Sequence, residues 1–453
     1  VSMVINNLAK VAPQPIMGRG QFIGLLSGSP GDVRLSGQAQ IANFEFLNYR
    51  LARAAGPMSL VWRNRQMTIQ ASAAGSGASG SGVVAAAGGP APVGKIELSS
   101  LPDGRVLIRS MSIIGKAAKV DGAGGQNLFG GGLTFKGRLV VPDMAALRPG
   151  GKGTLQASWS AAQTTAPGAP WTFVVEGRGD HFATGAGDLD QVLGPEPRMS
   201  GHAGFVGDVV SFDTVSLTGA KAQANAQGQW KLDGSLKFDL AWQADGPFNL
   251  GPLEADGKAT GMGTLTGQIG APRLDLHTRL ASINLPNLAI KDAALDLAFA
   301  QAANGTDGRV SLTGQSEYGP ARARSDLRFL GRGLDLTGVD VDAGGVRAKG
   351  QMALRDQGLS TADLSLAITP GAVLSEGRAE GHIRVTGGQG PANADLELKA
   401  TGAVMRGQAL ALGSARLTAK GPLSRLPYQI NADGAVAHAP LKLNAAGVFA
   451  TDP

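Results

Sequence analysis

The sequence predicts an all-β protein built as one long antiparallel sheet with few short helices, and three observations predict it. Apolar and polar residues alternate strictly along many segments, which is the period of a strand with one buried face. Glycine fills 68 of 453 positions, about twice the usual share, and because glycine disfavours helices few segments could form one. Turn signatures recur at roughly the spacing of short antiparallel strands.

The clearest strands lie in the middle of the chain. Residues 220–232 place Ala, Gly, Trp and Leu on one parity, and mainly Lys, Gln and Asn on the other. The Asp233-Gly234 pair follows, and residues 236–242 continue the alternation. Asp-Gly between alternating runs is a strong hairpin signal, and Pro102-Asp103-Gly104 has the same form. Both sites are predicted to be hairpin turns.

Two segments, Asp143–Arg148 and Asp188–Leu193, begin with an Asp that can cap a helix, and each predicts a turn or two of helix. Gly75–Gly80 (GSGASG) matches the GxGxxG dinucleotide fingerprint formally. No credible helix follows it, as a βαβ unit requires, so a flexible hairpin loop is the favoured interpretation.

Composition excludes several functions. The chain has no Cys, so disulfides, cysteine-ligated metals and thiol catalysis are excluded. The net charge of +6 is spread thinly, so no nucleic-acid partner is expected. We expect no catalytic residue, cofactor or metal, because the histidines lack ligand spacing: His181, His202, His277, His382 and His438. No stretch approaches the roughly 20 apolar residues of a membrane span, and Val1–Gly20 predicts neither signal peptide nor anchor.

The arginine-rich segment Ala321–Arg332 alternates basic with other residues. A solvated strand face is its favoured interpretation. The alternative is a contact for lipid phosphates, since arginine can bind phosphate through two parallel hydrogen bonds.

An internal repeat runs through the chain, weak in identity but consistent in order. Asp256–Ala259 resembles Glu376–Ala379 at an offset of about 120 residues, as expected for a repeated supersecondary unit. The repeat units fall near residues 20–62, 263–299 and 381–419. We expect residues 1–453 to form one continuous segment.

A sheet of this length cannot stay open and flat, because open sheets rarely exceed about 10 strands without curling or splitting. One solution is a set of β-sandwiches whose cores hold the aromatic residues. The other is a single sheet curled into an elongated trough, a β-taco or repeating β-groove, with its apolar parity inside. We favour the trough, because no polar linkers divide the chain and many inward positions are Ala or Gly. Such an apolar floor exceeds what a soluble monomer normally exposes, and lipid tails fit it.

The candidate groove-lining residues share the apolar parity of their strands. They are Val33, Leu35, Ile41, Phe44, Phe46, Leu60, Trp62, Phe212, Val215, Leu217, Trp230, Leu232, Leu236, Phe238, Leu240, Trp242, Leu288, Ile290, Leu295, Leu297 and Phe299.

Four segments carry a family resemblance: Gly263–Phe299, its counterpart Gly381–Ala419, Ser110–Val141 and Gly187–Gly201. They resemble the TamB branch of the AsmA-like repeating β-groove proteins. The resemblance implies a curved sheet in the periplasm that carries phospholipid between the inner and outer membranes. It also implies an inner-membrane anchor in sequence outside this chain and, in some members, an outer-membrane β-barrel partner of the TamA or BamA type.

The sequence thus predicts a non-enzymatic conduit for phospholipid acyl chains. The alternative is a scaffold for outer-membrane protein translocation and assembly, acting by β-strand pairing at a sheet edge. A β-helical adhesin is disfavoured, because no ladder recurs every 20 to 25 or so residues.

Overall fold

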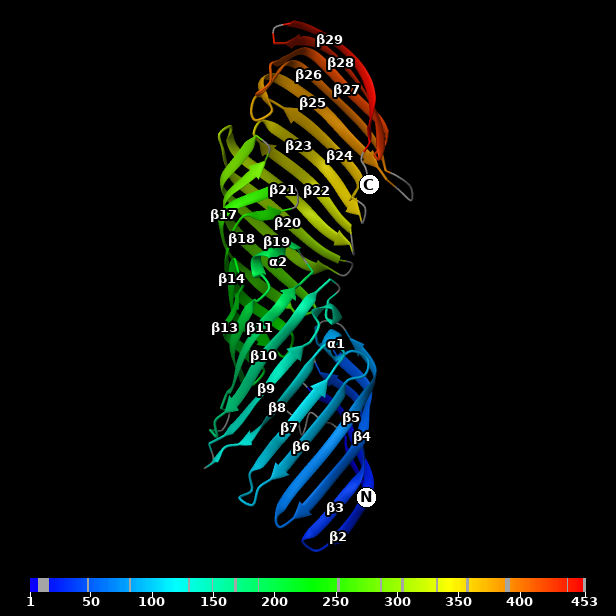
Figure 1. The fold of residues 1–453 in the computed structure, drawn as a ribbon, viewed down its shortest axis with the longest axis vertical. Coiled ribbons are helices and arrows are strands. Elements are labelled where there is room, and N and C mark those ends of the chain that lie inside the picture. The colour runs from blue at the N-terminus through cyan, green and yellow to red at the C-terminus, as the bar shows by residue number, and fades with distance from the viewer. Residues whose placement is uncertain are drawn as a thin grey trace. The chain divides into compact units, whose positions relative to one another are not determined.

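The structure is a computed structural model in which the strands form a long antiparallel sheet with few short helices (Figure 1). It describes residues 1–450 apart from 7–15, 47–48, 81–82, 129–130, 149, 167–168, 186, 251–252, 286, 303–304, 331–332, 356–357, 388–391 and 438. The predicted all-β class is confirmed. The chain divides into two compact units, unit 1 (Val1–Ser235) and unit 2 (Leu236–Pro453). The expectation of one continuous segment over residues 1–453 stays a prediction.

In unit 1 each strand pairs antiparallel with the next along the chain, as in a meander. The strands are β1 (Ser2–Ile5), β2 (Ile16–Ser29), β3 (Asp32–Phe46), β4 (Tyr49–Arg63), β5 (Gln66–Gly80), β6 (Val93–Ser100), β7 (Val106–Ile114), β8 (Lys119–Gln126), β9 (Leu133–Val141), β10 (Lys152–Gln163), β11 (Trp171–Ala183), β12 (Arg198–Val206), β13 (Val209–Thr218) and β14 (Ala222–Lys231).

Unit 2 continues the same pattern, with β15 paired to β17 and every later strand paired to the next. Its strands are β15 (Ser235–Asp245), β16 (Phe248–Leu250), β17 (Leu253–Gln268), β18 (Ala271–Leu285), β19 (Leu288–Ala302), β20 (Gly305–Ser316), β21 (Gly319–Leu330), β22 (Gly333–Ala343), β23 (Val346–Arg355), β24 (Gly358–Ile368), β25 (Leu374–Thr386), β26 (Asn393–Met405), β27 (Leu410–Pro422), β28 (Arg425–Val436) and β29 (Ala439–Ala450).

Both predicted Asp-Gly turns are present. Gly104 has φ of 85° and donates its N–H to the carbonyl of Leu101, which closes the turn between β6 and β7. Gly234 has φ of 92° and donates to the carbonyl of Lys231 at the end of β14. Glycine takes this left-handed backbone without the steric cost of a Cβ, so the turn chemistry in the sequence was a reliable guide.

The two predicted short helices are confirmed. The 3₁₀ helix η3 (Met144–Ala146) is capped by Asp143, whose carboxylate accepts a hydrogen bond from the Ala145 N–H at 2.9 Å. The other is α2 (Gly187–Leu193). The expectation that no helix follows Gly75–Gly80 is wrong, because α1 (Val83–Gly88) lies there.

The prediction of a flexible loop at Gly75–Gly80 is wrong, because these residues are the last part of strand β5. Their small side chains suit a close approach of neighbouring elements. A Cβ on Gly75 would lie 3.0 Å from Leu51 of β4 and from Pro92. Glycine and serine here therefore make room for packing instead of conferring flexibility.

The predicted trough is not reproduced, because the sheet is neither closed nor strongly curled. The apolar face is instead bent locally, at β-bulges inside individual strands. Such bulges increase twist and bend a strand without rolling up the whole sheet. Gly257 in β17 and Asp292 in β19 have positive φ at shifts of strand register.

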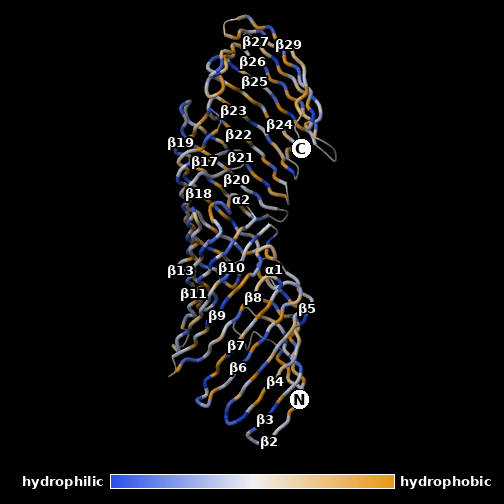
Figure 2. The backbone as a smooth tube through the Cα atoms, viewed as in Figure 1, coloured by the Kyte–Doolittle hydropathy of each residue, from blue (hydrophilic) through white to orange (hydrophobic). Residues whose placement is uncertain are grey.

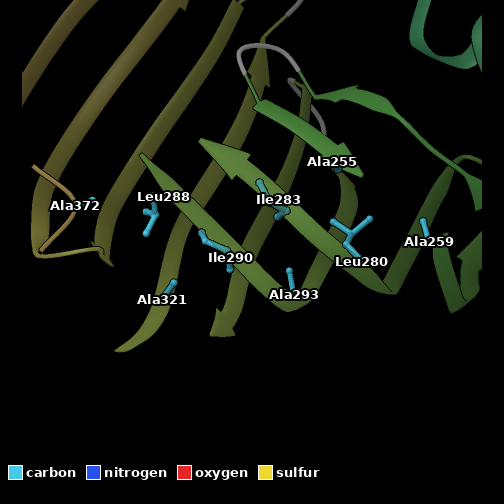
Figure 3. Packing of buried hydrophobic residues seen from close by; sticks show 9 residues of the cluster. All are labelled: Ala255, Ala259, Leu280, Ile283, Leu288, Ile290, Ala293, Ala321 and Ala372. Atoms are coloured by element: carbon cyan, nitrogen blue, oxygen red, sulfur yellow. The ribbon is translucent and has the colours of Figure 1, made fainter. Parts of the chain in front are cut away.

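A buried cluster lies beside these two bulges in unit 2 (Figure 3). Leu280 and Ile283 of β18 pack there with Ile290 of β19, together with Ala255, Ala259, Leu288, Ala293, Ala321 and Ala372. Most of these positions are alanine, so the core is thin and local.

The predicted repeat units each span parts of three consecutive strands: β2–β4, β17–β19 and β25–β27. Gly257 (φ 80°) and Gly377 (φ 76°), which the sequence aligned, both lie at register shifts with the following strand. The two aligned glycines thus have the same left-handed backbone conformation.

Aromatic rings cover cross-strand glycines in both units of the chain. Phe135 lies directly opposite Gly124, and Tyr428 lies directly opposite Gly447. A Cβ on Gly447 would lie 2.7 Å from the Tyr428 hydroxyl oxygen. Glycine under an aromatic ring is a known way to stabilise a sheet, and it accounts for part of the glycine excess.

Candidate functional site

The two faces of the unit 2 sheet differ in chemistry, because residue parity is preserved from strand to strand. Leu276 of β18 faces Leu297 of β19, which faces Val310 of β20. Residues of the opposite parity are mostly charged or polar, as the alternation of orange and blue along the strands shows (Figure 2). One face is therefore apolar and the other is polar.

The apolar face is most continuous in β24–β28. Leu364, Ile383 and Leu396 form one cross-strand row over β24, β25 and β26. A second row, over β26, β27 and β28, contains Leu398, Leu417 and Ile430. All six side chains are half-buried. We call these two rows the apolar face of unit 2.

No second layer of protein covers these rows within the described residues. Large side chains with less than 2% exposure are absent there, and the buried apolar residues are mainly alanine. Phe449 of β29, opposite Leu426, remains 61% exposed. The apolar side chains are thus sheltered by their neighbours in the sheet but remain open on one side.

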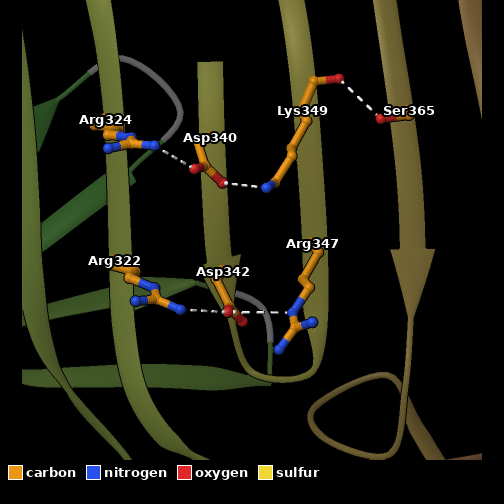
Figure 4. A network of polar contacts seen from close by, with 7 residues as sticks. All are labelled: Arg322, Arg324, Asp340, Asp342, Arg347, Lys349 and Ser365. Carbon is orange, nitrogen blue, oxygen red and sulfur yellow. Dashed lines mark hydrogen bonds and ion pairs between the residues drawn. The ribbon is translucent and has the colours of Figure 1, made fainter. Parts of the chain in front are cut away.

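The polar face carries ladders of ion pairs across neighbouring strands (Figure 4). Asp342 of β22 lies 3.2 Å from Arg322 of β21 and 3.2 Å from Arg347 of β23. An equivalent row contains Arg324, Asp340 and Lys349. Exposed pairs of this kind add little stability each, but they show that this face is suited to water. The favoured interpretation of Ala321–Arg332 as a solvated strand face is supported, since its described arginines pair with aspartates.

Hydrogen bonds to arginine and lysine also lower carboxyl pKa values on this face. The Arg328 guanidinium donates to Asp307 at 2.7 Å and holds the pKa of that carboxyl below its usual range. Glu397 has a lowered pKa for the same reason, because Lys399 donates a hydrogen bond to it. These carboxylates therefore stay ionised at neutral pH.

In unit 1 the apolar parity is also continuous across strands. Val33 of β3 faces Trp62 of β4, and Leu35 faces Leu60. Trp171 of β11 makes ring contacts with two phenylalanines, Phe135 of β9 at 6.0 Å and Phe173 at 6.4 Å between centroids. These aromatic residues lie along the sheet surface instead of filling a sandwich core.

The structure distributes the predicted lining residues over three environments. Leu35, Leu288 and Ile290 are buried, the last two in the cluster of Figure 3, where they offer no surface to a ligand. Trp62 and Leu217 are exposed, at 41% and 37%. The half-buried set contains Val33, Ile41, Phe44, Phe46, Leu60, Phe212, Val215, Trp230, Leu232, Leu236, Phe238, Leu240, Trp242, Leu295, Leu297 and Phe299.

The six residues of the apolar face of unit 2 were missing from the predicted lining set. Their signal was present in the sequence, because Leu396 and Leu398 alternate with Asp395, Glu397 and Lys399. Cross-strand register, which no single sequence gives, was needed to place them in rows.

The polar face of unit 2 is hollowed between its ion-pair ladders. One hollow in unit 2 is lined by Arg322, Arg324, Asp340 and Asp342 among others.

The described part of the chain contains no group of three or more His, Asp or Glu side chains placed to hold a metal ion. His277 contacts Asp296, and His382 contacts Asp363 at 3.1 Å. His438 lies outside the described residues. None of the described helices has the length and apolar character needed to cross a membrane.

No protein-family profile matches the chain, and no curated protein matches it significantly.

Proposed function

We propose that this chain binds phospholipid acyl chains along its apolar sheet faces, without catalysis, and passes them between the inner and outer membranes of a Gram-negative cell. The periplasm is the proposed location, with an inner-membrane anchor in sequence outside this chain. An outer-membrane β-barrel of the TamA or BamA type is the proposed partner.

One observation carries the proposal: the apolar face of unit 2 is continuous over several strands, and none of the described residues forms a protein layer above it. A half-exposed Leu or Ile that becomes covered gains on the order of 1 kcal/mol. Each methylene of an acyl chain gains a similar amount, about 0.8 kcal/mol. Both the protein side chains and the acyl chain therefore lose exposed apolar surface when hydrocarbon covers the two rows, and this favours binding.

The surface chemistry also supports movement instead of fixed binding. Apolar contact is non-directional, so a tail can slide along the rows with little change in energy. Leu364, Ile383 and Leu396 offer no hydrogen-bonding group that would hold a tail at one position. A conduit is the function that such a surface suits.

The test is lipid binding by the purified chain. We expect phospholipid to copurify and to be identified by mass spectrometry, and a fluorescent phospholipid to bind. The variant Leu396→Lys places a charge at the β26 end of the first row, on the same strand as Leu398 of the second row, and should reduce bound lipid severalfold. Gln351→Lys is the matched control, because Gln351 is exposed on the polar face opposite Asp363.

A folded, lipid-free preparation that also fails to bind the fluorescent phospholipid would overturn the proposal. Equal lipid loss in Leu396→Lys and Gln351→Lys would do so too, because only one of them alters the apolar face. Circular dichroism of each variant shows that the sheet is intact. Copurification of a stoichiometric protein on the apolar face, with no lipid, would assign that face to a protein partner instead.

A further inference from the structure

Two arginines face each other directly in unit 1. Arg178 of β11 and Arg198 of β12 are cross-strand partners on the polar face, and both are exposed. Like charges placed directly opposite each other in a sheet are destabilising. Within the described residues neither guanidinium makes an ion pair, and Asp180, on β11 with Arg178, contacts His181 instead.

These arginines line a hollow of about 710 Å³ over strands β9–β13. Arg138 of β9 contributes a third guanidinium, and Glu176 is the one carboxylate among the lining residues. The rest of the polar lining is small, with hydroxyl or amide groups: Gln156, Ser158, Ser200, Ser216 and Thr218. The lining of the hollow thus has an excess of positive charge and several hydrogen-bonding groups.

The ion pairs on the polar face of unit 2 contrast with the facing arginines of unit 1. There, arginines alternate across strands with aspartates, so that Asp340 separates Arg324 from Lys349. In unit 1 the corresponding arrangement lacks the intervening acid. An anion placed between Arg178 and Arg198 would supply the missing negative charge.

We propose that Arg178 and Arg198, with Arg138, form a binding site for a phosphate-bearing ligand. The planar guanidinium fork matches the oxygens of a phosphate and can donate two parallel hydrogen bonds to it. Ser200 lies on β12 with Arg198, and Thr218 lies directly opposite Arg198 on β13, so their hydroxyls can complete the set of donors. The site lies on the polar face, so it is independent of the apolar surface that the proposed function uses.

The test uses thermal unfolding of the whole chain in a low-salt buffer at pH 7. Sodium phosphate is compared with sodium chloride at equal ionic strength. We expect phosphate to raise the Tm more than chloride does. Arg198→Gln and Arg178→Gln should each weaken the apparent phosphate affinity about tenfold, since each removes one of two facing forks.

The Tm measured without phosphate distinguishes a binding site from a pair of arginines that only stabilises the fold. Without phosphate, Arg198→Gln should leave the Tm unchanged or raise it, because the repulsion is relieved. Arg324→Gln is the matched control: it disturbs a paired arginine in unit 2 and should leave the phosphate response intact.

Vesicle flotation identifies the source of the phosphate. Binding to vesicles that contain phosphatidylglycerol, lost in Arg198→Gln, assigns the site to a lipid headgroup. A Tm response to phosphate without vesicle binding assigns it to a soluble phosphoester. Equal effects of phosphate and chloride, or a lowered Tm of phosphate-free Arg198→Gln, would overturn the proposal.

Discussion

Phe299 of β19 lies directly opposite Gly308 of β20, and its ring occupies the space that a side chain at position 308 would need. A Cβ there would lie 2.7 Å from the ring of Phe299 and 2.9 Å from the carbonyl oxygen of Ala298. Phe299 is therefore flattened onto the sheet and covers the neighbouring strand. The small residue and the large one act together as one packing unit.

Replacing this glycine should therefore destabilise unit 2. We expect Gly308→Val to cost about 1–3 kcal/mol, the usual penalty for overpacking, measured by urea denaturation. Gly94→Ala in β6 is the control, since a Cβ there meets nothing within 4 Å. It should be neutral or slightly stabilising. If both variants lost the same stability, the loss would come from strand glycine in general and not from the ring of Phe299.

The sequence predicted the antiparallel strands, both Asp-Gly turns and both short helices, because those features depend on local chemistry. Strict alternation marked β14 and β15, and Asp143 marked η3. The bends inside individual strands could not be predicted in the same way. They depend on bulges such as those at Gly257 and Asp292, where the register with the next strand shifts.

The predicted lining residues also show what a local sequence pattern can and cannot predict. Parity identified Leu295, Leu297 and Phe299 as members of an apolar surface. It could not show that Leu288 and Ile290 are buried beside a bulge, since Ala321 and Ala372, which cover them, come from other strands and loops. The rows of β24–β28 were missed because they are defined by cross-strand register.

The two aligned bulges can be tested by matched substitutions. Gly257 and Gly377 both have left-handed backbone, and a Cβ at position 257 would lie 2.8 Å from that of Ala281. We expect Gly257→Ala and Gly377→Ala to lose about 1–3 kcal/mol each, from backbone strain and crowding. Gly402→Ala is the control, because Gly402 is also left-handed but has open space.

The control should lose less, about 1 kcal/mol, from backbone strain alone. Urea denaturation of the three variants gives the comparison. A large loss at Gly257 with none at Gly377 would contradict the predicted repeat.

The ion pair between Asp307 and Arg328 predicts a dependence of stability on pH. The hydrogen bond from Arg328 lowers the pKa of Asp307 in the folded protein. A carboxyl whose folded pKa is depressed stabilises the fold above its unfolded pKa of about 4. That contribution is lost as the pH falls through the lower, folded pKa.

We therefore expect Asp307→Asn to lower the Tm at pH 6, with a difference from the native chain that shrinks below about pH 4. Arg328→Gln should behave in the same way, and the double variant should add little to either. A Tm difference that stayed constant from pH 6 to pH 2 would show that the pair contributes no proton-linked stability.

Charged substitutions in β15 distinguish lipid binding from a scaffold that pairs strands at a sheet edge. Phe238 and Leu240 share the apolar parity of β15, whereas Asp239 between them is exposed on the other parity. We expect Phe238→Lys and Leu240→Lys to reduce bound fluorescent phospholipid severalfold, because each places an ammonium group among apolar side chains. Asp239→Lys changes the charge by a larger amount on the polar face and should leave lipid binding intact.

Edge pairing depends on backbone N–H and C=O groups, so a scaffold would tolerate all three variants as long as circular dichroism shows an intact sheet. Unchanged lipid binding in folded Phe238→Lys and Leu240→Lys would exclude this part of the apolar parity from the lipid path.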